Sequence, residues 1–404
     1  MTPVLLAPAS ATSAAVFPQP ADRGNDAPVV ALAAAGCRTP LGDTRATADA
    51  LLRGQRALQM LPVRGQDGGD LVPLGLIDDW QPAAGAAASD GQPRWEKPLL
   101  EFLQTSVPDR PWGQPRFPVF ITSSNFGIGE LYAYFQDRAD ARLPYLLPHQ
   151  LTAWFGARLG WGGNVTHFSH ACVSSNLGLL YASRQVGAGL ADEALVVTYD
   201  FLSPFVAAGF HALKILFNAL PAPYAEREFG AVGLGDGVAF AVLTRPRSSG
   251  DSGFRLEAQA GANEMYHFTG NHPDGIGMGQ LAVTMRAAAE ARGQRVWVKG
   301  HGTGTIEAGR LEARHMSEAF PGAPLVSWKG ALGHTLGSCG LVELALAMEF
   351  IRRGQAPGTI GSEGEPCFSA EVATAPFALG EFTGCVLNSY AFGGAHYAFL
   401  LGHG

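Results

Sequence analysis

The sequence has few charged residues and no cluster of positive charge. Asp, Glu, Lys and Arg make up 16% of the 404 residues, and the net charge is −7. A surface that binds nucleic acid needs Lys and Arg gathered on one face, so we expect no nucleic-acid partner. Hydrophobic residues make up 47% of the chain, which predicts a compact fold rather than a disordered one.

Cysteine is also scarce. The five residues Cys37, Cys172, Cys339, Cys367 and Cys385 include no C-x-x-C pair, and their number is odd. Neither a disulfide framework nor a zinc ribbon is therefore indicated, and we expect no metal site. The pattern favours a reducing compartment, for which we predict the cytoplasm.

The first residues lack charge and helical continuity. Residues 2–21 carry no charge, contain four prolines and have no basic segment before the apolar run at 4–7. Because prolines interrupt a membrane helix and secretory signals begin with basic residues, neither is predicted. We expect residues 1–27 to form a flexible leader.

Glycine, by contrast, is abundant. It accounts for 52 of the 404 residues, roughly twice the average share of ~7%. This favours tight turns and close approach of the backbone to a ligand. The chain is also longer than a single hydrophobic core usually becomes, which predicts two packed halves.

Apolar runs bounded by Gly or Pro alternate with helical patterns along the chain, which predicts an α/β fold with buried sheets. The expected strands cover residues 29–35, 119–123, 194–199, 237–243, 296–299, 325–328 and 385–389. The expected helices cover residues 150–159, 174–186, 278–292 and 340–353.

Two segments hint at an internal duplication. LLYASRQVGA at 179–188 and LAMEFIRRGQA at 346–356 are apolar helices that reach a basic residue and a glycine. Each follows a turn that is rich in small residues and contains a cysteine. We therefore expect two similar halves, 28–248 and 249–404, joined in the linker-like segment RPRSSGDS.

Cys172 lies where an irregular turn meets an apolar helix, in the segment THFSHACVSSN. The positive end of a helix dipole favours a thiolate, the form of cysteine that attacks a thioester. A single cysteine in such a place is more often a small buried residue, so this feature alone does not identify a nucleophile.

His301 follows a predicted strand inside the turn VKGHGTGT. A turn with so little bulk lets a long ligand lie along the backbone, and the hydroxyls of Thr303 and Thr305 can hydrogen-bond to it. The alternative interpretation of this turn is a phosphate-binding loop. The segment lacks the G-x-x-x-x-G-K-[ST] spacing, so no nucleotide cofactor is expected.

Two further glycine-rich turns complete the set. His334 lies in KGALGHTLG, again between a predicted strand and a helix, and NSYAFGG ends another strand near the C-terminus. Two histidines in matching contexts are difficult to explain as core packing. The Gly-Gly turn could present a backbone N–H group to an oxyanion.

These four segments, in this order, resemble the β-ketoacyl synthase family from about residue 29 to the C-terminus. Family members carry an A-C-x-S turn, an H-G-T-x-T loop, a K-S-x-x-G-H-x-x-G loop and an N-S-F-G-F-G-G end. The resemblance implies an α/β thiolase fold, with two similar halves stacked in five layers, αβαβα. It also implies the elongating branch, which uses two histidines.

The resemblance implies roles for individual residues. Cys172 is the expected nucleophile, and His301 and His334 are expected to hold the extender thioester. Lys329 and Glu312 resemble a supporting ion pair. Phe392 resembles the gate beside the cysteine, and Glu264 and His267 resemble part of the mobile loop that faces this gate. The other expected substrate contacts are Thr303, Thr305 and Tyr134.

The implied activity is that of a β-ketoacyl-ACP synthase, an acyltransferase without a cofactor. It would join an acyl group on Cys172 to malonyl-ACP with loss of carbon dioxide. Acyl carrier protein is the expected partner, together with a second subunit in a homodimer or heterodimer. The alternatives are a chain-length-factor-like subunit of a ketosynthase heterodimer and a thioester hydrolase, for which no water-activating acid is evident.

Several positions depart from the family pattern. Gly309 replaces the usual Asp, His396 and the preceding Ala replace Thr-Asn, and Tyr390 with the following Ala replaces Phe-Gly. The family's R-P-[FY]-D stretch is reduced to APYA at 222–225. These departures leave the three main residues intact and favour a polyketide or polyene pathway over ordinary fatty acid synthesis.

Overall fold

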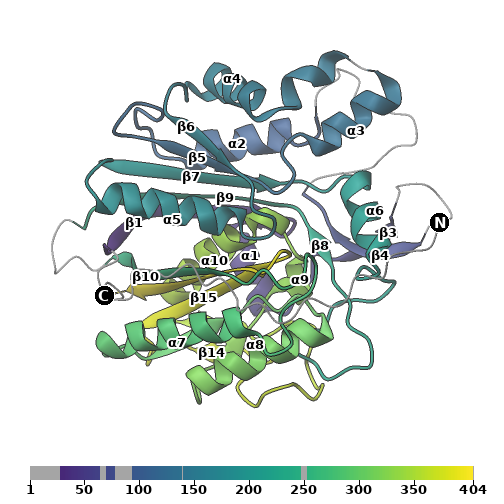
Figure 1. Ribbon diagram of the computed structural model, residues 1–404, viewed down its shortest axis with the longest axis vertical. Helices are drawn as coiled ribbons and strands as arrows, with labels where there is room; N and C mark the ends of the chain where they lie inside the picture. Colours follow the sequence, from purple (N-terminus) through teal and green to yellow (C-terminus); the bar gives the residue numbers. More distant parts are fainter. Residues whose placement is uncertain (1–27, 64–69, 78–92, 139, 247–252, 404) are drawn as a thin grey trace, which may run out of the picture.

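The computed structural model describes residues 28–63, 70–77, 93–138, 140–246 and 253–403. The predicted leader and most of the predicted linker lie outside these residues, as does the boundary between 248 and 249. Figure 1 shows sheets and helices stacked in alternating layers.

The N-terminal half is built on a five-stranded sheet with the order β1-β9-β7-β5-β6. β9 is antiparallel to both β1 and β7, whereas β5 is parallel to β7 and to β6. The strands are β1 (Val30–Thr39), β5 (Val119–Thr122), β6 (Val165–Phe168), β7 (Glu193–Asp200) and β9 (Gly237–Thr244).

The C-terminal half repeats this sheet strand for strand, with the order β10-β16-β15-β11-β12. Its antiparallel and parallel pairs follow the same sequence. The strands are β10 (Phe254–Asn263), β11 (Val296–Lys299), β12 (Leu325–Val326), β15 (Gly384–Ala391) and β16 (Ala395–His403). The prediction of two similar α/β halves is confirmed.

The two sheets join at a short contact and enclose a helical layer. β1 pairs with β10 at two positions, Val30 with Leu256 and Ala31 with Arg255. Helices α5 (Ser174–Gly187) and α10 (Cys339–Arg353) lie between the sheets, while α2 (Glu96–Ser106) and α4 (Pro148–Leu159) cover one outer face (Figure 1). α7 (Ile276–Ala291) and α8 (Ile306–Ala319) cover the other, which completes the αβαβα order.

The remaining elements connect this frame. They are β2 (Gly42–Asp43), α1 (Thr44–Leu52), β3 (Gln59–Pro62), β4 (Leu71–Gly75), α3 (Ile128–Asp137), η1 (Asp140–Tyr145), α6 (Pro204–Ala212), β8 (Leu234–Gly235), α9 (Lys329–Leu332), η2 (Leu336–Ser338), β13 (Gln355–Ala356) and β14 (Phe377–Ala378).

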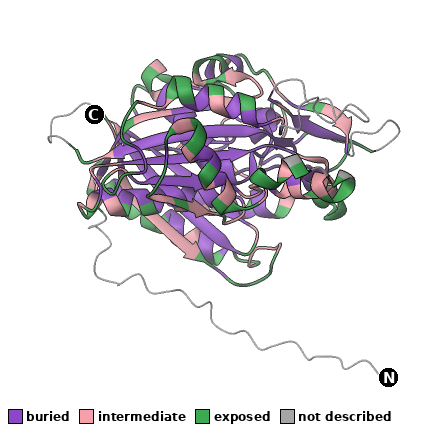
Figure 2. Cartoon of the chain, turned by 90° about the horizontal axis from the view of Figure 1, so that it is seen from above, coloured by how far each residue is buried: buried purple, intermediate pink, exposed green. Residues whose placement is uncertain are grey.

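The core is centred on the middle layer. Every residue of α10 from Cys339 to Phe350 is buried, because the helix packs against both sheets and against α5. Figure 2 shows the strands in the buried colour and most exposed residues on the outer helices. Side chains at the start of α5 and α10 are therefore held by a buried layer of the molecule.

The predicted elements are present, with shifted ends. All four expected helices form, and six of the seven expected strands match β1, β5, β7, β9, β11 and β15 closely. The seventh, expected over 325–328, ends at Val326 because Trp328 caps the short helix α9. β10 and β16 were not predicted, although they pair with each other along nine residues.

Candidate active site

Cys172 sits on a sharp turn between β6 and α5. Ala171, the residue before it, has a positive φ of 45°, a conformation that L-residues rarely adopt. Ser174 fixes the turn because its hydroxyl donates to the Ala171 carbonyl at 2.7 Å and accepts from the His170 N–H at 2.8 Å. The turn places the thiol at the start of the helix, as the sequence predicted.

The thiol of Cys172 is 8% exposed, and burial is the main influence on it. Burial raises the pKa of Cys172 well above the ordinary 9.0, and nearby Cys339 raises it further, while the charge of Lys329 lowers it. Burial therefore opposes the thiolate that the place at the helix start was expected to favour, and the net effect favours a protonated sulfur.

His301 and His334 lie side by side. Their ring centroids are 5.0 Å apart and the rings are nearly perpendicular, at 86°. His301 follows β11, and the backbone N–H of His334 donates to the carbonyl of Gly233 at 2.7 Å. Among the described residues, no hydrogen-bond partner meets Nδ1 of His301 or either ring nitrogen of His334. Buried polar atoms without partners indicate a place for a ligand.

Both imidazoles are held in the uncharged form. Their pKa values lie well below 6.5 because burial disfavours the charged ring and the ammonium of Lys329 adds repulsion, with a further contribution from Lys299. A neutral imidazole carries one N–H donor. Two such donors directed at one oxygen could stabilise negative charge that develops there.

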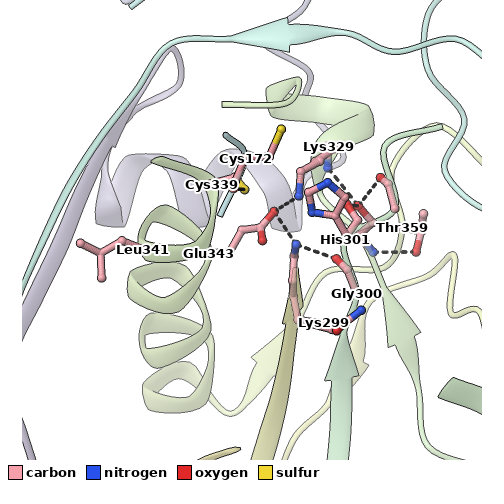
Figure 3. Close-up of polar contacts among 12 residues, drawn as sticks. Cys172, Lys299, Gly300, His301, Lys329, Cys339, Leu341, Glu343 and Thr359 are labelled. Carbon is pink, nitrogen blue, oxygen red and sulfur yellow. Dashed lines mark hydrogen bonds and ion pairs between the residues drawn. The ribbon is translucent and has the colours of Figure 1, made fainter. Parts of the chain in front are cut away.

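The predicted ion pair between Lys329 and Glu312 is wrong. The ammonium of Lys329 instead contacts Glu343 Oε1 at 2.5 Å, and Lys299 reaches the same oxygen (Figure 3). Glu343 lies on the second turn of α10, which faces the end of β11. Lys329 is still buried beside the imidazoles, as expected, but its partner comes from a different helix.

Glu312 accepts hydrogen bonds from the loop that carries His301. Its carboxylate accepts from the backbone N–H groups of His301, at 2.6 Å, and Gly302, at 2.8 Å. It also accepts from the hydroxyl of Tyr224 at 2.8 Å and from the side chain of Asn388 at 2.6 Å. Glu312 thus fixes the conformation of the loop that carries His301. Tyr224 belongs to the segment 222–225 that departs from the family pattern, and it still bonds to this carboxylate.

Figure 3 draws Cys172 and His301 around the same interior region, with Lys329 and Glu343 beside them. Cys339 connects the two halves here, because its thiol donates to the Cys172 carbonyl at 3.2 Å. Cys339 is fully enclosed, which agrees with a packing role.

The expected gate lies next to a loop from β10. Phe392 is partly buried and stacks on Phe210, with ring centroids 6.2 Å apart. The Gly393 N–H that follows it donates to the carbonyl of Phe268 at 3.0 Å. Gly394 has φ of 77° and lies so close to the Glu264 carbonyl that a Cβ atom would clash with it. The loop and the Gly-Gly turn are therefore docked on each other.

The other expected substrate contacts differ in exposure. Thr303 is buried and its hydroxyl lies 3.2 Å from that of Thr305, so both line the same turn. His267 is exposed, and its ring Nδ1 accepts from the Gly270 N–H. Tyr134 lies on α3 beside Phe135 and Arg138. No described contact joins Tyr134 to the histidines, so its role stays a prediction.

Glu264 is buried and bonded, unlike the rest of its loop. Burial opposes its ionisation, but His396 and the N–H groups of Gly277 and His272 lower the pKa of Glu264 to about 2. The His396 ring lies 3.3 Å from it. The unusual His396 therefore anchors the base of the predicted mobile loop.

Sequence reasoning missed Lys299, Glu343 and the connection through His396. A signal was present for each: Lys299 ends an apolar strand, and Glu343 is an acidic residue within an apolar helix. Charged residues in otherwise apolar elements are rarely buried without a partner. Among the described residues, no group of three His, Cys, Asp or Glu side chains could hold a metal ion. No helix among them is long and apolar enough to cross a membrane.

Comparison with known proteins matches part of the chain to a family model. The model of the β-ketoacyl synthase C-terminal domain matches residues 256–363. The chain is 32% identical over 234 residues to the granaticin polyketide putative beta-ketoacyl synthase 1 of Streptomyces violaceoruber, which is 53% of this chain and 55% of that protein. The chain thus spans about half the length of such polyketide relatives.

Two further likenesses extend over more of the chain. It is 23% identical over 344 residues to the 3-oxoacyl-[acyl-carrier-protein] synthase 2 of Coxiella burnetii, covering 78% of this chain and 80% of that one. A chain of the solved complex of the ketosynthase ApeO with its chain length factor ApeC, from Xenorhabdus doucetiae, has a TM-score of 0.73 at 23% identity. That match covers 93% of this chain and 98% of the solved chain.

The repeated halves and the αβαβα order define a thiolase fold, which solved ketosynthase structures share. Residues 256–363 match the β-ketoacyl synthase C-terminal domain, and the chain is similar in sequence to β-ketoacyl synthases.

Proposed function

We propose that the protein is a β-ketoacyl synthase that condenses an acyl thioester on Cys172 with malonyl-ACP. One observation carries the proposal: two uncharged imidazoles, 5.0 Å apart, have ring nitrogens that no described residue satisfies. The drawing of Cys172 and His301 around one interior region in Figure 3 supports a shared substrate. Such an arrangement suits the developing negative charge of an enolate.

The first step loads the enzyme. The sulfur of Cys172 attacks the acyl carrier thioester, a carbon–sulfur bond forms, and the carrier leaves as a thiol that takes the cysteine proton. One thioester replaces another, so the exchange is close to balanced in energy. The hydrophobic surroundings of Cys172 exclude water, which protects the acyl-enzyme from hydrolysis.

The second step makes the carbon–carbon bond. Malonyl-ACP loses carbon dioxide, and the electron pair left behind becomes an enolate whose oxygen accepts N–H groups from His301 and His334. The enolate carbon attacks the acyl carbonyl, the carbon–sulfur bond breaks, and the thiolate of Cys172 leaves and takes a proton from solvent. No electrons are gained or lost overall, so the reaction needs no redox cofactor.

Carrier protein is the proposed source of both substrates, since the Coxiella burnetii relative is named for an acyl-carrier-protein substrate. ApeO is solved together with a chain length factor, which supports pairing of this chain with a related subunit. A chain-length-factor-like role for the chain itself is less well supported. Such a subunit has no need of a nucleophile, whereas Cys172, His301 and His334 are all present.

The test is mass spectrometry of the intact protein after incubation with an acyl carrier protein. The proposal expects one acyl group per chain, located at Cys172, and its loss in Cys172→Ala. Cys339→Ala is the matched control, because this second buried thiol should not be needed for loading. Addition of malonyl-ACP should then release β-ketoacyl-ACP. Wild-type protein that neither loads nor condenses would refute the proposal.

A further inference from the structure

The chain contains only four lysines, Lys97, Lys214, Lys299 and Lys329. Two of them, Lys299 and Lys329, lie together in the core, with 0% and 2% exposure. Lys299 ends β11, where alternation turns it to the same side as Trp297, toward α10. A lysine is rarely buried without a charged partner, because removing its charge from water costs free energy.

The two ammonium groups share a single carboxylate. Both contact Glu343 Oε1, and Lys299 Nζ also donates to the Gly300 carbonyl at 2.7 Å (Figure 3). One carboxylate balances one ammonium, so this cluster holds one positive charge in excess. The buried carboxylate of Glu312 accepts from four neutral donors instead.

The excess charge remains at neutral pH. Burial lowers the pKa of Lys299 to about 8, Glu343 opposes this shift, and Lys329 adds to it. Lys299 is therefore mostly protonated near pH 7. Its Nζ donates to the carbonyl of Gly300, directly before His301. The same side chain therefore fixes the loop and places a positive charge near the two imidazoles.

We propose that Lys299 is a positioning residue of the condensation site, whose ammonium orients the His301 loop and adds, with Lys329, to the positive charge beside both imidazoles. The proposal rests on the proposed function, in which the imidazoles act as neutral donors. Besides Lys299, the titratable groups around the two rings are Lys329, Glu312, Glu343, Cys172, Cys339, Tyr224, Tyr390 and His396.

The test is the pH profile of condensation by acyl-loaded enzyme. Lys299→Met keeps the length of the side chain and removes its charge. The activity lost at low pH, where the imidazoles become protonated, should then be lost at a pH about one unit higher. Lys97→Met is the matched control: it removes the same charge from a side chain that is 83% exposed, and should leave the profile unmoved.

A second variant should move the profile in the opposite direction. Glu343→Gln removes the negative charge that the lysines share, so the acid limb should shift to lower pH. A purely structural role would lower the rate at every pH and move neither limb. Unmoved limbs in both variants would overturn the proposal.

The imidazole pKa values can also be read without turnover, by NMR of protein labelled with carbon-13 at histidine. Lys299→Met should raise them for His301 and His334, and unchanged values would overturn the inference. If wild-type protein made no β-ketoacyl product, the proposed function would fail, while the NMR comparison would still decide the role of Lys299.

Discussion

Ala171 and Leu336 have the same unusual backbone conformation at equivalent places in the two halves. Their φ angles are 45° and 54°, and each lies three residues before its helix, α5 or α10. The residue that follows is Cys172 in one half and Gly337 in the other. The duplicated fold thus builds the same turn twice and places a thiol on one of them.

Because of this positive φ, position 171 should accept alanine or glycine but not a β-branched residue. Ala171→Val should lower the free energy of unfolding by ~1–3 kcal/mol, because a β-branched residue is strained at positive φ. Ala171→Gly should be tolerated, since glycine adopts this conformation readily. Urea denaturation measures both. A Val variant as stable as wild type would show that the turn is not under this constraint.

Removing the charge of Glu312 should lower both the stability and the activity of the protein. Glu312→Gln keeps the size of the side chain but weakens four buried hydrogen bonds, including two from the loop of His301. We expect a loss of ~2–3 kcal/mol in stability and a lower condensation rate. Glu307→Gln, at an exposed position on the same helix, should change neither. Equal behaviour of the two variants would contradict the role of Glu312.

The two half-reactions should respond differently to pH. Burial raises the pKa of Cys172 above 9.0, so the thiolate fraction, and with it the loading rate, should rise about tenfold per pH unit between about pH 6 and 8. His301 and His334 titrate well below 6.5 and stay neutral in this interval, so condensation by loaded enzyme should be nearly flat. Rapid-quench measurements of each step test this, and loading that is independent of pH would argue against a protonated thiol.

The hydroxyl of Tyr390, beside His301, should contribute nothing to stability, because no described residue bonds to it. The two rings lie 4.2 Å apart, and no described residue bonds to the hydroxyl. Because a buried donor without a partner is costly, Tyr390→Phe should leave stability unchanged or raise it by up to ~1 kcal/mol. Thermal unfolding of the unliganded protein measures the change. A marked loss of stability would mean that the hydroxyl has a partner after all.

The sequence predicted the parts of the fold that have strong local patterns. Buried parallel strands such as β5 and β7 are continuous apolar runs, and α10 is a long apolar helix. β10 was missed because its alanines, glycine and polar residues have low strand propensity, and its pairing with β16 and β1 makes it a strand.

The candidate site was predicted unevenly for a similar reason. Glycine-rich turns mark Cys172, His301 and His334 locally, and all three are buried as a functional group would be. Which carboxylate faces Lys329 depends on how α8 and α10 pack, and no spacing along the chain reveals that. Glu312 was therefore assigned the contact that Glu343 makes.

The central claim is that one sulfur and two imidazoles act on the same substrate. The most direct measurement is a chase, in which enzyme acylated at Cys172 is mixed with malonyl-ACP and the adduct is followed by mass spectrometry. Wild type should discharge the acyl group as β-ketoacyl-ACP, whereas His301→Ala and His334→Ala should load normally and retain it. Discharge at the wild-type rate in either variant would contradict the account.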